Sequence, residues 1–377
     1  MVAMIGGQVT LSAYTTLGLG GPVDRFIQAT SEDELIDAVR AADQAGDSVL
    51  VLGGGSNLVV ADAGFRGTVI HVGTRGLVVS ERGGANDSGR HGSRTVAVTV
   101  AAGETWDHLV EWTVSEKLSG VECLAGIPGL AGATPIQNVG AYGQEVAETI
   151  LAVRTFDRLS GKVVTLSPAQ CEFGYRASML KRAAAGEATG RYVVLDVTFG
   201  LQRPSGSGPA LSTPIWYPEL VKTLGVAQND RVPLDLAREA VLELRRGKGM
   251  LLDPADPDTR SAGSFFTNPV LTAEQFADVQ RKAAERYGAQ FLVPHLQDET
   301  GGDARKISAA WLIEQAGFAK GYGHPARVST KHALALTNPG GADTAALLAL
   351  ASQIRDTVRE IFGIELVNEP VLVGGSL

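Results

Sequence analysis

The sequence predicts an α+β protein of two or three domains. Its 377 residues are more than one ordinary hydrophobic core holds. In the N-terminal half, helix and strand patterns alternate, beginning with an amphipathic helix at 31–45 and a buried strand at 48–52. Beyond 202–214, a stretch rich in Pro, Ser and Gly that we expect to be a linker, the composition becomes helical.

The predicted helices carry start and stop signals. Ser31 with Glu34 and Thr272 with Gln275 have the spacing of capping boxes. Gly247 follows a periodic apolar run, as a C-terminal glycine does. The expected helices are 31–45, 105–117, 233–246, 272–287, 308–316 and 342–362.

Alternating or continuously apolar runs predict the strands. The clearest alternation lies in 191–201. A charged, glycine-rich insertion at 82–94 separates two strands, and we expect it to be an exposed hairpin loop. The expected strands are 48–52, 68–72, 77–80, 95–100, 150–157, 162–166, 191–201, 364–367 and 371–373.

Composition excludes several classes of function. A net charge of −8 argues against sequence-independent nucleic-acid binding. Cys123 and Cys171 are too few for a disulfide framework and lack the CxxC spacing of zinc or redox sites, so we expect two buried thiols and no metal. The first basic residue is Arg25, and no apolar run approaches the ~18 residues of a membrane span. We therefore expect a cytoplasmic protein with small-molecule partners, no nucleic acid and no membrane.

Two glycine-rich segments are the strongest sign of a binding site. Residues 126–145 contain five glycines and two prolines, a composition that offers main-chain N–H groups and permissive dihedral angles. The turn LGGGSN, 52–57, follows a strand directly. Both GxGxxG and the Walker pattern are absent, so an anionic cofactor would be held in another way. We expect Gly140 and Gly143 to leave room for a bulky ligand; the alternative for 52–57 is a plain tight turn.

Three side chains have the chemistry for catalysis, each with a plainer alternative. Ser264, between a glycine and two phenylalanines, can protonate a strong base such as a carbanion, or be a turn serine. Arg176 can bind a carboxylate bidentately, or be a solvated surface residue. Glu369 is the third candidate, an acid in an otherwise apolar tail, and a glutamate on an edge strand explains it equally well. The basic cluster at 245–248 can complement a helix dipole.

Taken together, eight motifs in order resemble the UDP-N-acetylenolpyruvoylglucosamine reductase family, also called UDP-N-acetylmuramate dehydrogenases, flavoenzymes of peptidoglycan precursor synthesis. The resemblance spans nearly the whole chain. The motifs are TTLGLGGP (15–22), LGGGSNLVV (52–60), AGIPGLAGATPIQNVGAYG (125–143), YRAS (175–178), RRGKG (245–249), GSFFTNP (263–269), KISAAWLIEQAGFAKG (306–321) and NEPVLVG (368–374).

The resemblance implies an FAD-binding domain of two α+β lobes, of the vanillyl-alcohol-oxidase/PCMH type, and a separate α+β substrate-binding domain. The implied bounds are 1–215 for the FAD domain, with lobes at about 1–75 and 76–215, and 216–363 for the substrate domain. The strand segment 364–377 would return to the FAD domain. The implied cofactors are FAD and NADPH, and the substrate is a nucleotide sugar.

The resemblance also implies roles for individual residues. Arg176 would stabilise the substrate carboxylate and the charge delocalised onto it, Glu369 would share that charge, and Ser264 would deliver the proton. The implied FAD-binding residues are Gly53, Gly54, Gly55, Ser56, Asn57, Gly126, Gly129, Gly132, Ala133, Thr134, Pro135, Gln137, Asn138, Gly140 and Ala141. The implied substrate-binding residues are Tyr175, Tyr217, Lys248, Asn268 and His332; the last lies in VSTKH (328–332), where the chain departs from the family pattern.

Two other functions remain open at this stage. The chain could be another FAD-dependent oxidoreductase on the same scaffold, such as an alcohol or sugar oxidase, or a non-catalytic protein that binds a nucleotide sugar. Many such oxidases attach FAD through a histidine near the glycine turn, and 52–57 contains none. We expect a monomer or a weak oligomer with a role in cell wall synthesis, cell shape and cell division.

Overall fold

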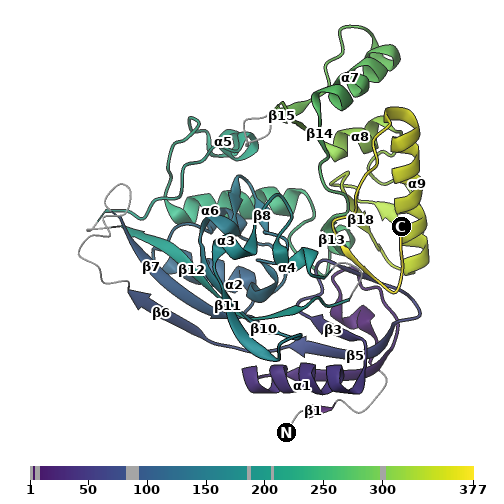
Figure 1. Cartoon of the computed structure of the whole chain (residues 1–377). Helices are drawn as coiled ribbons and strands as arrows, with labels where there is room; N and C mark the ends of the chain where they lie inside the picture. Colours follow the sequence, from purple (N-terminus) through teal and green to yellow (C-terminus); the bar gives the residue numbers. More distant parts are fainter. Residues whose placement is uncertain (1–2, 5–8, 82–92, 185–187, 205–207, 298–302) are drawn as a thin grey trace. The chain divides into compact units, whose positions relative to one another are not determined.

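The computed structural model describes residues 3–4, 9–81, 93–184, 188–204, 208–297 and 303–377, so most of the predicted loop at 82–94 lies outside the described residues. The chain forms two compact units, each made of segments that are separate in the sequence; Figure 1 colours the chain by sequence position. Unit 1 consists of Met1–Val9, Val23–Gly55 and Phe65–Gly247. Unit 2 consists of Thr10–Pro22, Ser56–Gly64 and Lys248–Leu377.

A small sheet with a covering helix forms the N-terminal part of unit 1. Three of its strands are parallel and one edge strand is antiparallel, in the order β1-β2-β5-β3. The first helix lies against this sheet (Figure 1) and begins as predicted, because the Ser31 hydroxyl accepts the Glu34 N–H at 3.2 Å. The elements are β1 (Ala3–Met4), β2 (Val23–Ala29), α1 (Glu32–Ala45), β3 (Val49–Leu52) and β5 (Phe65–Val72).

A five-stranded antiparallel sheet forms the larger part of unit 1, in the order β11-β10-β12-β7-β6. Its strands are β6 (Leu77–Glu81), β7 (Ser93–Ala101), β10 (Ile150–Asp157), β11 (Lys162–Leu166) and β12 (Tyr192–Pro204). The observed bounds of β10 and β11 equal the predicted ones. The predicted linker at 202–214 begins inside β12, where Gln202, Arg203 and Pro204 still pair with β7, so that part of the prediction is wrong.

The helices of unit 1 continue past the predicted domain boundary at 215. α6 packs against α2 and against the turn Glu122–Leu124, and these contacts place it in unit 1. The compact units therefore divide at Gly247, while the division of roles at 215 stays a prediction. The remaining elements are α2 (Trp106–Ser115), β8 (Gly140–Ala141), β9 (Gln144–Glu145), α3 (Pro168–Cys171), α4 (Met179–Arg182), α5 (Pro218–Leu224) and α6 (Leu234–Gly247).

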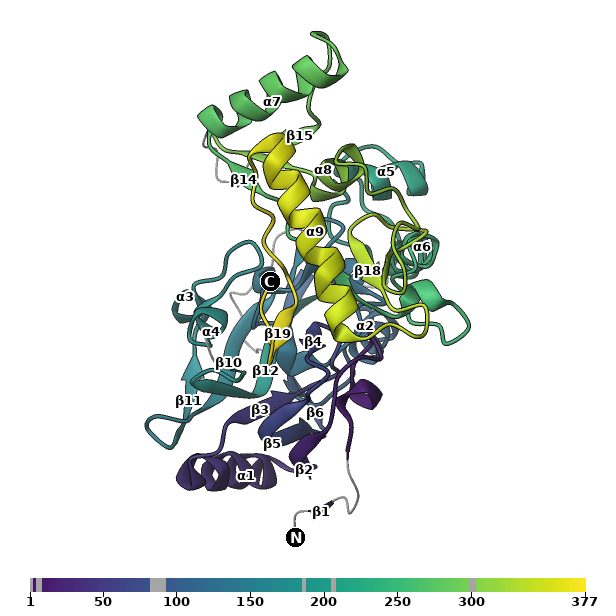
Figure 2. The same cartoon turned by 90° about the vertical axis from the view of Figure 1, so that its right-hand side faces the viewer.

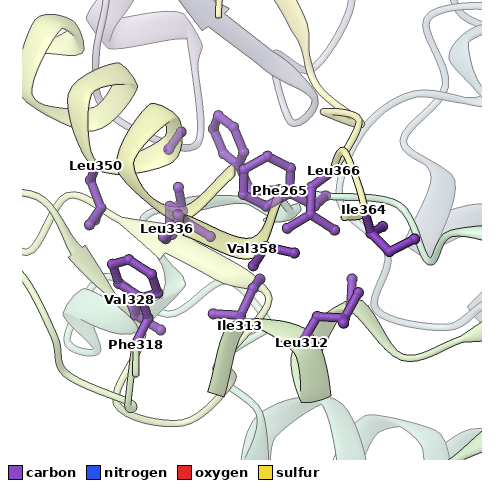
Figure 3. Packing of buried hydrophobic residues seen from close by; sticks show 14 of the residues in the cluster. Phe265, Leu312, Ile313, Phe318, Val328, Leu336, Leu350, Val358, Ile364 and Leu366 are labelled. Atoms are coloured by element: carbon purple, nitrogen blue, oxygen red, sulfur yellow. The ribbon is translucent and has the colours of Figure 1, made fainter. Parts of the chain in front are cut away.

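Unit 2 packs its helices and short strands around one apolar cluster (Figure 3), which includes Phe265, Leu312, Val358 and Leu366. The predicted capping box at Thr272 and Gln275 is present at the start of α7. The elements are β4 (Leu58–Val60), β13 (Ser261–Ser264), β14 (Val270–Leu271), α7 (Ala273–Tyr287), β15 (His295–Gln297), β16 (Arg305–Ile307), α8 (Ala309–Gln315), β17 (Arg327–Val328), β18 (Ala335–Thr337), α9 (Thr344–Phe362) and β19 (Val371–Val373).

The C-terminal segment joins two distant parts of the sequence within unit 2. β19 pairs in parallel with β4, which directly follows the first glycine turn, and both lie near α9 in Figure 2. The predicted strand at 364–367 is wrong. Its Ile364 and Leu366 are buried as the alternation predicts, but the segment forms no ladder. The Val367 carbonyl accepts the Thr267 N–H at 3.0 Å, and an isolated bridge between Asn368 and Phe266 follows it.

Asp62, two residues after β4, caps the N-terminus of α9. The Asp62 carboxylate accepts the N–H groups of Thr344 at 2.8 Å and Ala345 at 3.0 Å. We expect Asp62→Ala to lower the free energy of unfolding by about 1–2 kcal/mol, because two orphan donors and a favourable dipole interaction lose their partner. Chemical denaturation measures the change, with the exposed Glu360→Ala in the same helix as control. Equal stability of the two variants would contradict this account of the cap.

Two arginines link the two sheets of unit 1. Arg154 on β10 pairs with Glu32 at the start of α1 and with Asp196 at 2.6 Å. Arg158 pairs with Asp43 of α1 at 2.6 Å. Helix α1 is thereby tied to the five-stranded sheet near both of its ends, which fixes the lobes that carry the two glycine segments.

The end of β10 contains a pH-sensitive ion pair. Arg191 donates two hydrogen bonds of 2.7 Å to Asp157 and, together with Ser160 and Leu159, holds the pKa of that carboxyl well below its usual range. We expect Asp157→Asn to cost about 1–2 kcal/mol near pH 7. Because the folded pKa is depressed, this contribution is complete above the unfolded pKa of about 4 and is lost as the pH falls below it. Urea denaturation of both proteins from pH 7 to pH 3 tests this, and a constant difference would contradict it.

Candidate active site

The two glycine segments touch each other in unit 1. Gly53, Gly54 and Gly55 follow β3, and a Cβ on Gly54 would lie 2.8 Å from the Cα of Gly129 in the second segment. A Cβ on Gly53 would meet only the Leu130 side chain, at 3.6 Å. Gly55 adopts a φ of +61°, which favours glycine. The close approach of the two main chains is the kind of cradle that an anionic cofactor requires.

The second segment is held by its own unit. The N–H of Gly126 donates to Asp107 at 2.6 Å, and that of Gly132 donates to Ala102 at 3.0 Å. A Cβ on Gly132 would lie 2.4 Å from the Cβ of Ala102. Ala131–Ala133 forms a single 3-10 turn, followed by the buried Thr134 and Pro135. The main chain of the cradle is therefore fixed by hydrogen bonds and close contacts within unit 1, which fits a bound dinucleotide such as FAD.

Both polar atoms of the Asn138 side chain form hydrogen bonds within the protein. Its amide nitrogen donates to Glu145 at 2.6 Å and to the Gly174 carbonyl at 3.1 Å, and its oxygen accepts the Ala147 N–H at 3.1 Å. Asn138 is buried with a φ of 46°, whereas Gln137 is half-buried and Ala133 is exposed. A role for Asn138 in holding FAD therefore falls to its main chain.

Side chains of the chain itself occupy the space that Gly140 and Gly143 leave. A Cβ on Gly140 would lie 3.1 Å from Nη1 of Arg176, and one on Gly143 would lie 2.8 Å from the Trp216 ring. The expectation that these glycines make room for a ligand is thus wrong at Gly143, which makes room for an indole.

Arg176 is fastened to the glycine segment rather than solvated at random. Its guanidinium donates to the carbonyl oxygens of Gly140 at 2.6 Å and Asn138 at 3.4 Å, and it lies 5.2 Å from the centre of the Tyr175 ring. Its φ of 52° is unusual for a residue with a Cβ. The structure therefore orients a half-buried cation at the second glycine segment, as binding of a carboxylate requires.

In unit 2, hydrogen bonds of the main chain bring together the segments of Ser264, Glu369 and Asn57. The carbonyl of Phe265, the residue after Ser264, accepts the N–H of Glu369 at 2.9 Å. The Asn57 side chain donates to the Glu369 carbonyl at 3.4 Å, and the Asn57 carbonyl accepts the Val371 N–H at 2.9 Å. Three predicted site residues separated by hundreds of positions thus have neighbouring main chains.

The environment of Ser264 limits its contact with water. Ser264 is half-buried at the end of β13, and the next two residues, Phe265 and Phe266, are buried and form an edge-to-face pair with ring centres 5.1 Å apart. Gly263 precedes it with a φ of +72°. A hydroxyl in such surroundings can act as a proton donor to a strong base.

The predicted substrate-binding residues lie in both units. In unit 2, the Asn268 side-chain oxygen accepts the Ala309 N–H at 2.9 Å, at the start of α8. His332 Nδ1 accepts the Leu334 N–H at 3.0 Å, so the neutral ring carries its proton on Nε2 and presents a donor there. Lys248 is half-buried at the first position of unit 2 after α6. Tyr175 and Tyr217 belong to unit 1.

Two residues of unit 1 that the sequence analysis did not single out as site residues have perturbed pKa values. Tyr142 lies inside the second glycine segment, and burial raises the pKa of its hydroxyl to about 12. Arg245 is only 7% exposed, and burial lowers the pKa of its guanidinium, with Tyr142 and Asp107 acting in the opposite direction. The signal for Arg245 is its position four residues after the buried Val241, on the buried face of α6. Arg245 does lie in the last turn of α6, as the helix-end interpretation predicts, but its burial was not predicted.

Three further observations concern the cysteines, metal ions and membranes. Cys123 and Cys171 are free and buried, as predicted. Within the described ranges, no group of three or more His, Cys, Asp or Glu side chains is arranged to hold a metal ion. None of the helices that the structure describes is both long and apolar enough to cross a membrane.

Comparison with known proteins identifies both halves of the chain. The family model described as FAD binding domain matches residues 23–167, and the model described as UDP-N-acetylenolpyruvoylglucosamine reductase, C-terminal domain, matches residues 254–373. These matches agree with the predicted α+β fold, in which an FAD-binding domain precedes a separate domain.

Individual relatives match over the full length. The UDP-N-acetylenolpyruvoylglucosamine reductase of Thermobifida fusca is 54% identical over 379 residues, covering 100% of both chains. That of Streptomyces coelicolor is 53% identical over 369 residues, covering 97% of this chain and 90% of its own. A solved structure of the enzyme from Thermus caldophilus shares the fold, with a TM-score of 0.61 and 24% identity over 99% of this chain and 100% of that one. The chain therefore belongs to the family of UDP-N-acetylenolpyruvoylglucosamine reductases, the FAD- and NADPH-dependent oxidoreductases of peptidoglycan precursor synthesis.

Proposed function

We propose that this chain reduces the enolpyruvyl ether of UDP-N-acetylglucosamine enolpyruvate to UDP-N-acetylmuramate, with hydride from NADPH and a proton from Ser264. When bound, FAD would supply the redox chemistry that carries reducing equivalents from NADPH to the terminal carbon of the enolpyruvyl double bond. The second carbon of that bond, which bears the carboxylate, takes the proton. NADPH and one proton are consumed for each double bond reduced.

The residues that would hold FAD are the main-chain groups of Gly53–Gly55 and of the second glycine segment. Support comes from the contact between Gly54 and Gly129 and from the FAD-binding family model over the same region. The substrate would contact Tyr175, Tyr217, Lys248, Asn268 and His332, with Lys248 providing a point charge for the diphosphate.

Arg176 stabilises the charge that develops during reduction. Hydride addition leaves negative charge delocalised onto the substrate carboxylate, and a guanidinium already oriented by two carbonyl oxygens stabilises it without reorganisation. Glu369, in its protonated form, shares this charge through a hydrogen bond. Because the intermediate is strongly basic, the weak acid Ser264 is able to protonate it.

The observation that carries this proposal is the hydrogen bond between the Phe265 carbonyl and the Glu369 N–H. It holds the main chain next to the proposed proton donor against the main chain of Glu369, and the Asn57 side chain donates to the Glu369 carbonyl from the end of the glycine turn. An alcohol oxidase reduces no carbon–carbon double bond in its substrate. It would therefore need neither a proton donor nor a second acid for such a step.

Steady-state kinetics test the proposal. We expect NADPH oxidation to depend on the enolpyruvyl nucleotide sugar, with a product two mass units heavier than the substrate. Rapid oxygen consumption with simple alcohols, and no product from the nucleotide sugar, would instead identify an oxidase. Binding of the sugar by a colourless protein would identify a non-catalytic binding protein.

The setting of the reaction is part of the proposal. We propose that the chain acts in the cytoplasm as a monomer or weak oligomer, without nucleic-acid or membrane partners. Its product would serve cell wall synthesis and, through it, cell shape and division. The domain roles proposed are FAD binding for 1–215 and substrate binding for 216–363, with 364–377 carrying Glu369 back to the glycine turn.

A further inference from the structure

Residues 329–334, which we call the histidine loop, connect β17 to β18 in unit 2 and carry His332. The hydroxyl of the fully buried Ser329 accepts the N–H groups of Lys331 at 3.1 Å and His332 at 3.2 Å. Further along, Nδ1 of the histidine accepts the Leu334 N–H at 3.0 Å. The position of the imidazole ring is therefore set by the conformation of this loop.

The end of the histidine loop is attached to the strand that carries Ser264. The Leu334 carbonyl accepts the Phe265 N–H at 2.7 Å. Directly beside this bond, Ser264 pairs with Ala335 across β13 and β18. A proposed substrate-binding residue, His332, and the proposed proton donor thus lie on main-chain segments that are hydrogen-bonded to each other.

Asp258 holds the histidine loop from a turn 72 positions away in the sequence. One of its carboxylate oxygens accepts the Thr330 N–H at 3.0 Å, and the other accepts the Thr330 hydroxyl. Asp258 is only 3% exposed, and the Arg327 guanidinium lies 3.8 Å from the same carboxylate. Hydrogen bonds to a charged group are stronger than neutral ones, and a buried carboxylate that loses its donors carries a desolvation penalty. The loop is therefore firmly tied at Thr330.

The turn that contains Asp258 has its own hydrogen bonds. Pro257–Thr259 forms a single 3-10 turn, capped by the Asp256 side chain, which accepts the Asp258 N–H at 3.1 Å. The Thr259 hydroxyl is within hydrogen-bond distance of the carbonyl oxygens of Asp253, at 2.9 Å, and Asp256, at 2.8 Å. The carboxylate of Asp258 is thus directed to the histidine loop rather than to its own turn.

Close packing places the same carboxylate beside the segment of Lys248. A Cβ on Gly249 would lie 3.1 Å from the Cβ of Asp258 and 3.3 Å from Cδ of Lys331. The Lys331 ammonium in turn donates to Asp256 at 2.5 Å. Because Gly249 directly follows Lys248, Asp258 packs between two segments that carry proposed substrate-binding residues.

We propose that Asp258 is a positioning residue that fixes the histidine loop and, through it, places His332 for contact with the nucleotide sugar. The inference rests on the proposed function, which makes the nucleotide sugar the substrate and His332 one of its contacts. Asp258 itself binds Thr330, so its effect on the reaction is carried by the loop.

Steady-state kinetics of the holoenzyme test this role. We expect Asp258→Ala to raise KM for the nucleotide sugar about tenfold, with a smaller change in kcat, because the loop loses two hydrogen bonds to a charged group. Reduction of the flavin by NADPH should be unchanged. Asp258→Asn keeps an acceptor for the Thr330 N–H and should raise KM only about threefold. The matched control is Asp253→Ala, an exposed carboxylate four residues after Gly249, which should leave KM unchanged.

A double-mutant cycle with His332→Ala separates positioning from a general effect on the fold. If Asp258 acts through His332, Asp258→Ala should change KM by less than about twofold once the imidazole is absent. A tenfold effect in both backgrounds would overturn the proposal, as would an unchanged KM in Asp258→Ala or in His332→Ala alone. If circular dichroism shows that Asp258→Ala is unfolded, Asp258→Asn takes its place in the cycle, and an equal effect in both backgrounds is again the contrary result.

Failure of the proposed function gives a different result. The wild-type protein would then not turn over the nucleotide sugar at all, whereas failure of the inference leaves wild-type turnover intact and changes only the pattern among the variants. Without wild-type turnover, the role given to Asp258 falls together with that of His332.

Discussion

Replacing Ser264 with alanine is expected to leave the reduction of the flavin by NADPH intact and to slow product formation by about 10²–10⁴-fold. The variant keeps the main-chain hydrogen bonds around Phe265, so the site retains its shape. It lacks only the hydroxyl that we propose as the proton donor to the carbon bearing the carboxylate, and removal of a general acid typically has an effect of this size. Stopped-flow measurement of the two half-reactions separates the intact step from the impaired one.

Ser261→Ala is the matched control, because Ser261 lies on the same short strand β13. Its hydroxyl accepts the Gly263 N–H at 3.3 Å, so its loss tests whether any missing hydroxyl on this strand slows the reaction. Normal turnover in Ser264→Ala would remove Ser264 as the proton donor. Equal loss of activity in both variants would point to a disturbed strand.

Gly54→Ala is expected to weaken FAD binding by about 10- to 100-fold, whereas Gly53→Ala should bind FAD as the wild type does. The Cβ of the first variant would lie 2.8 Å from the Cα of Gly129, a main-chain atom that cannot move aside cheaply. The Cβ of the second would meet Leu130 Cδ1 at 3.6 Å, an ordinary contact. Overpacking of this kind costs about 1–3 kcal/mol, which matches the expected fold-change.

The flavin content of the purified variants, with fluorescence titration of the apoproteins, measures this difference. Circular dichroism checks that each variant is folded. If both variants bind FAD equally well, the approach of Gly54 to Gly129 is not part of the FAD site. If only Gly54→Ala loses FAD while remaining folded, the two glycine segments act as one cradle.

Local sequence signals predict the helices and strands where the signal and its partner lie within a few residues. The cap at Ser31, the capping box at Thr272 and the bounds of β10 and β11 are of this kind. The segment 364–367 shows the limit of such signals. Its alternate burial is real, but a strand also needs a partner for its main chain, and that partner is set by the tertiary fold.

A glycine in a sequence can indicate a position where a larger side chain would not fit, but it does not identify the group that occupies the space. Gly143 suggested a ligand, and the structure puts Trp216 there, more than seventy positions away. In the same way, Asn57, Ser264 and Glu369 were each singled out by a motif or a resemblance, but their meeting depends on the pairing of β4 with β19 and on the bridge between Phe266 and Asn368. Periodicity along the chain carries no information on such long-range pairing.

Buried polar residues were the hardest to predict. Asn138 was expected to face a cofactor, and its side chain instead satisfies three groups of the fold. Arg245 was interpreted as a helix-end charge and is buried near Tyr142. In both cases the residue type alone does not distinguish a ligand contact from an internal hydrogen-bond partner.

The central claim is that this chain passes reducing equivalents from NADPH to an enolpyruvyl nucleotide sugar through bound FAD, and an anaerobic absorption titration tests it most directly. The purified protein should be yellow, its flavin band should bleach with one equivalent of NADPH, and the band should return when the enolpyruvyl nucleotide sugar is added, with an equal amount of product. A flavin that NADPH does not bleach, or one that stays reduced after the nucleotide sugar is added, would contradict the claim.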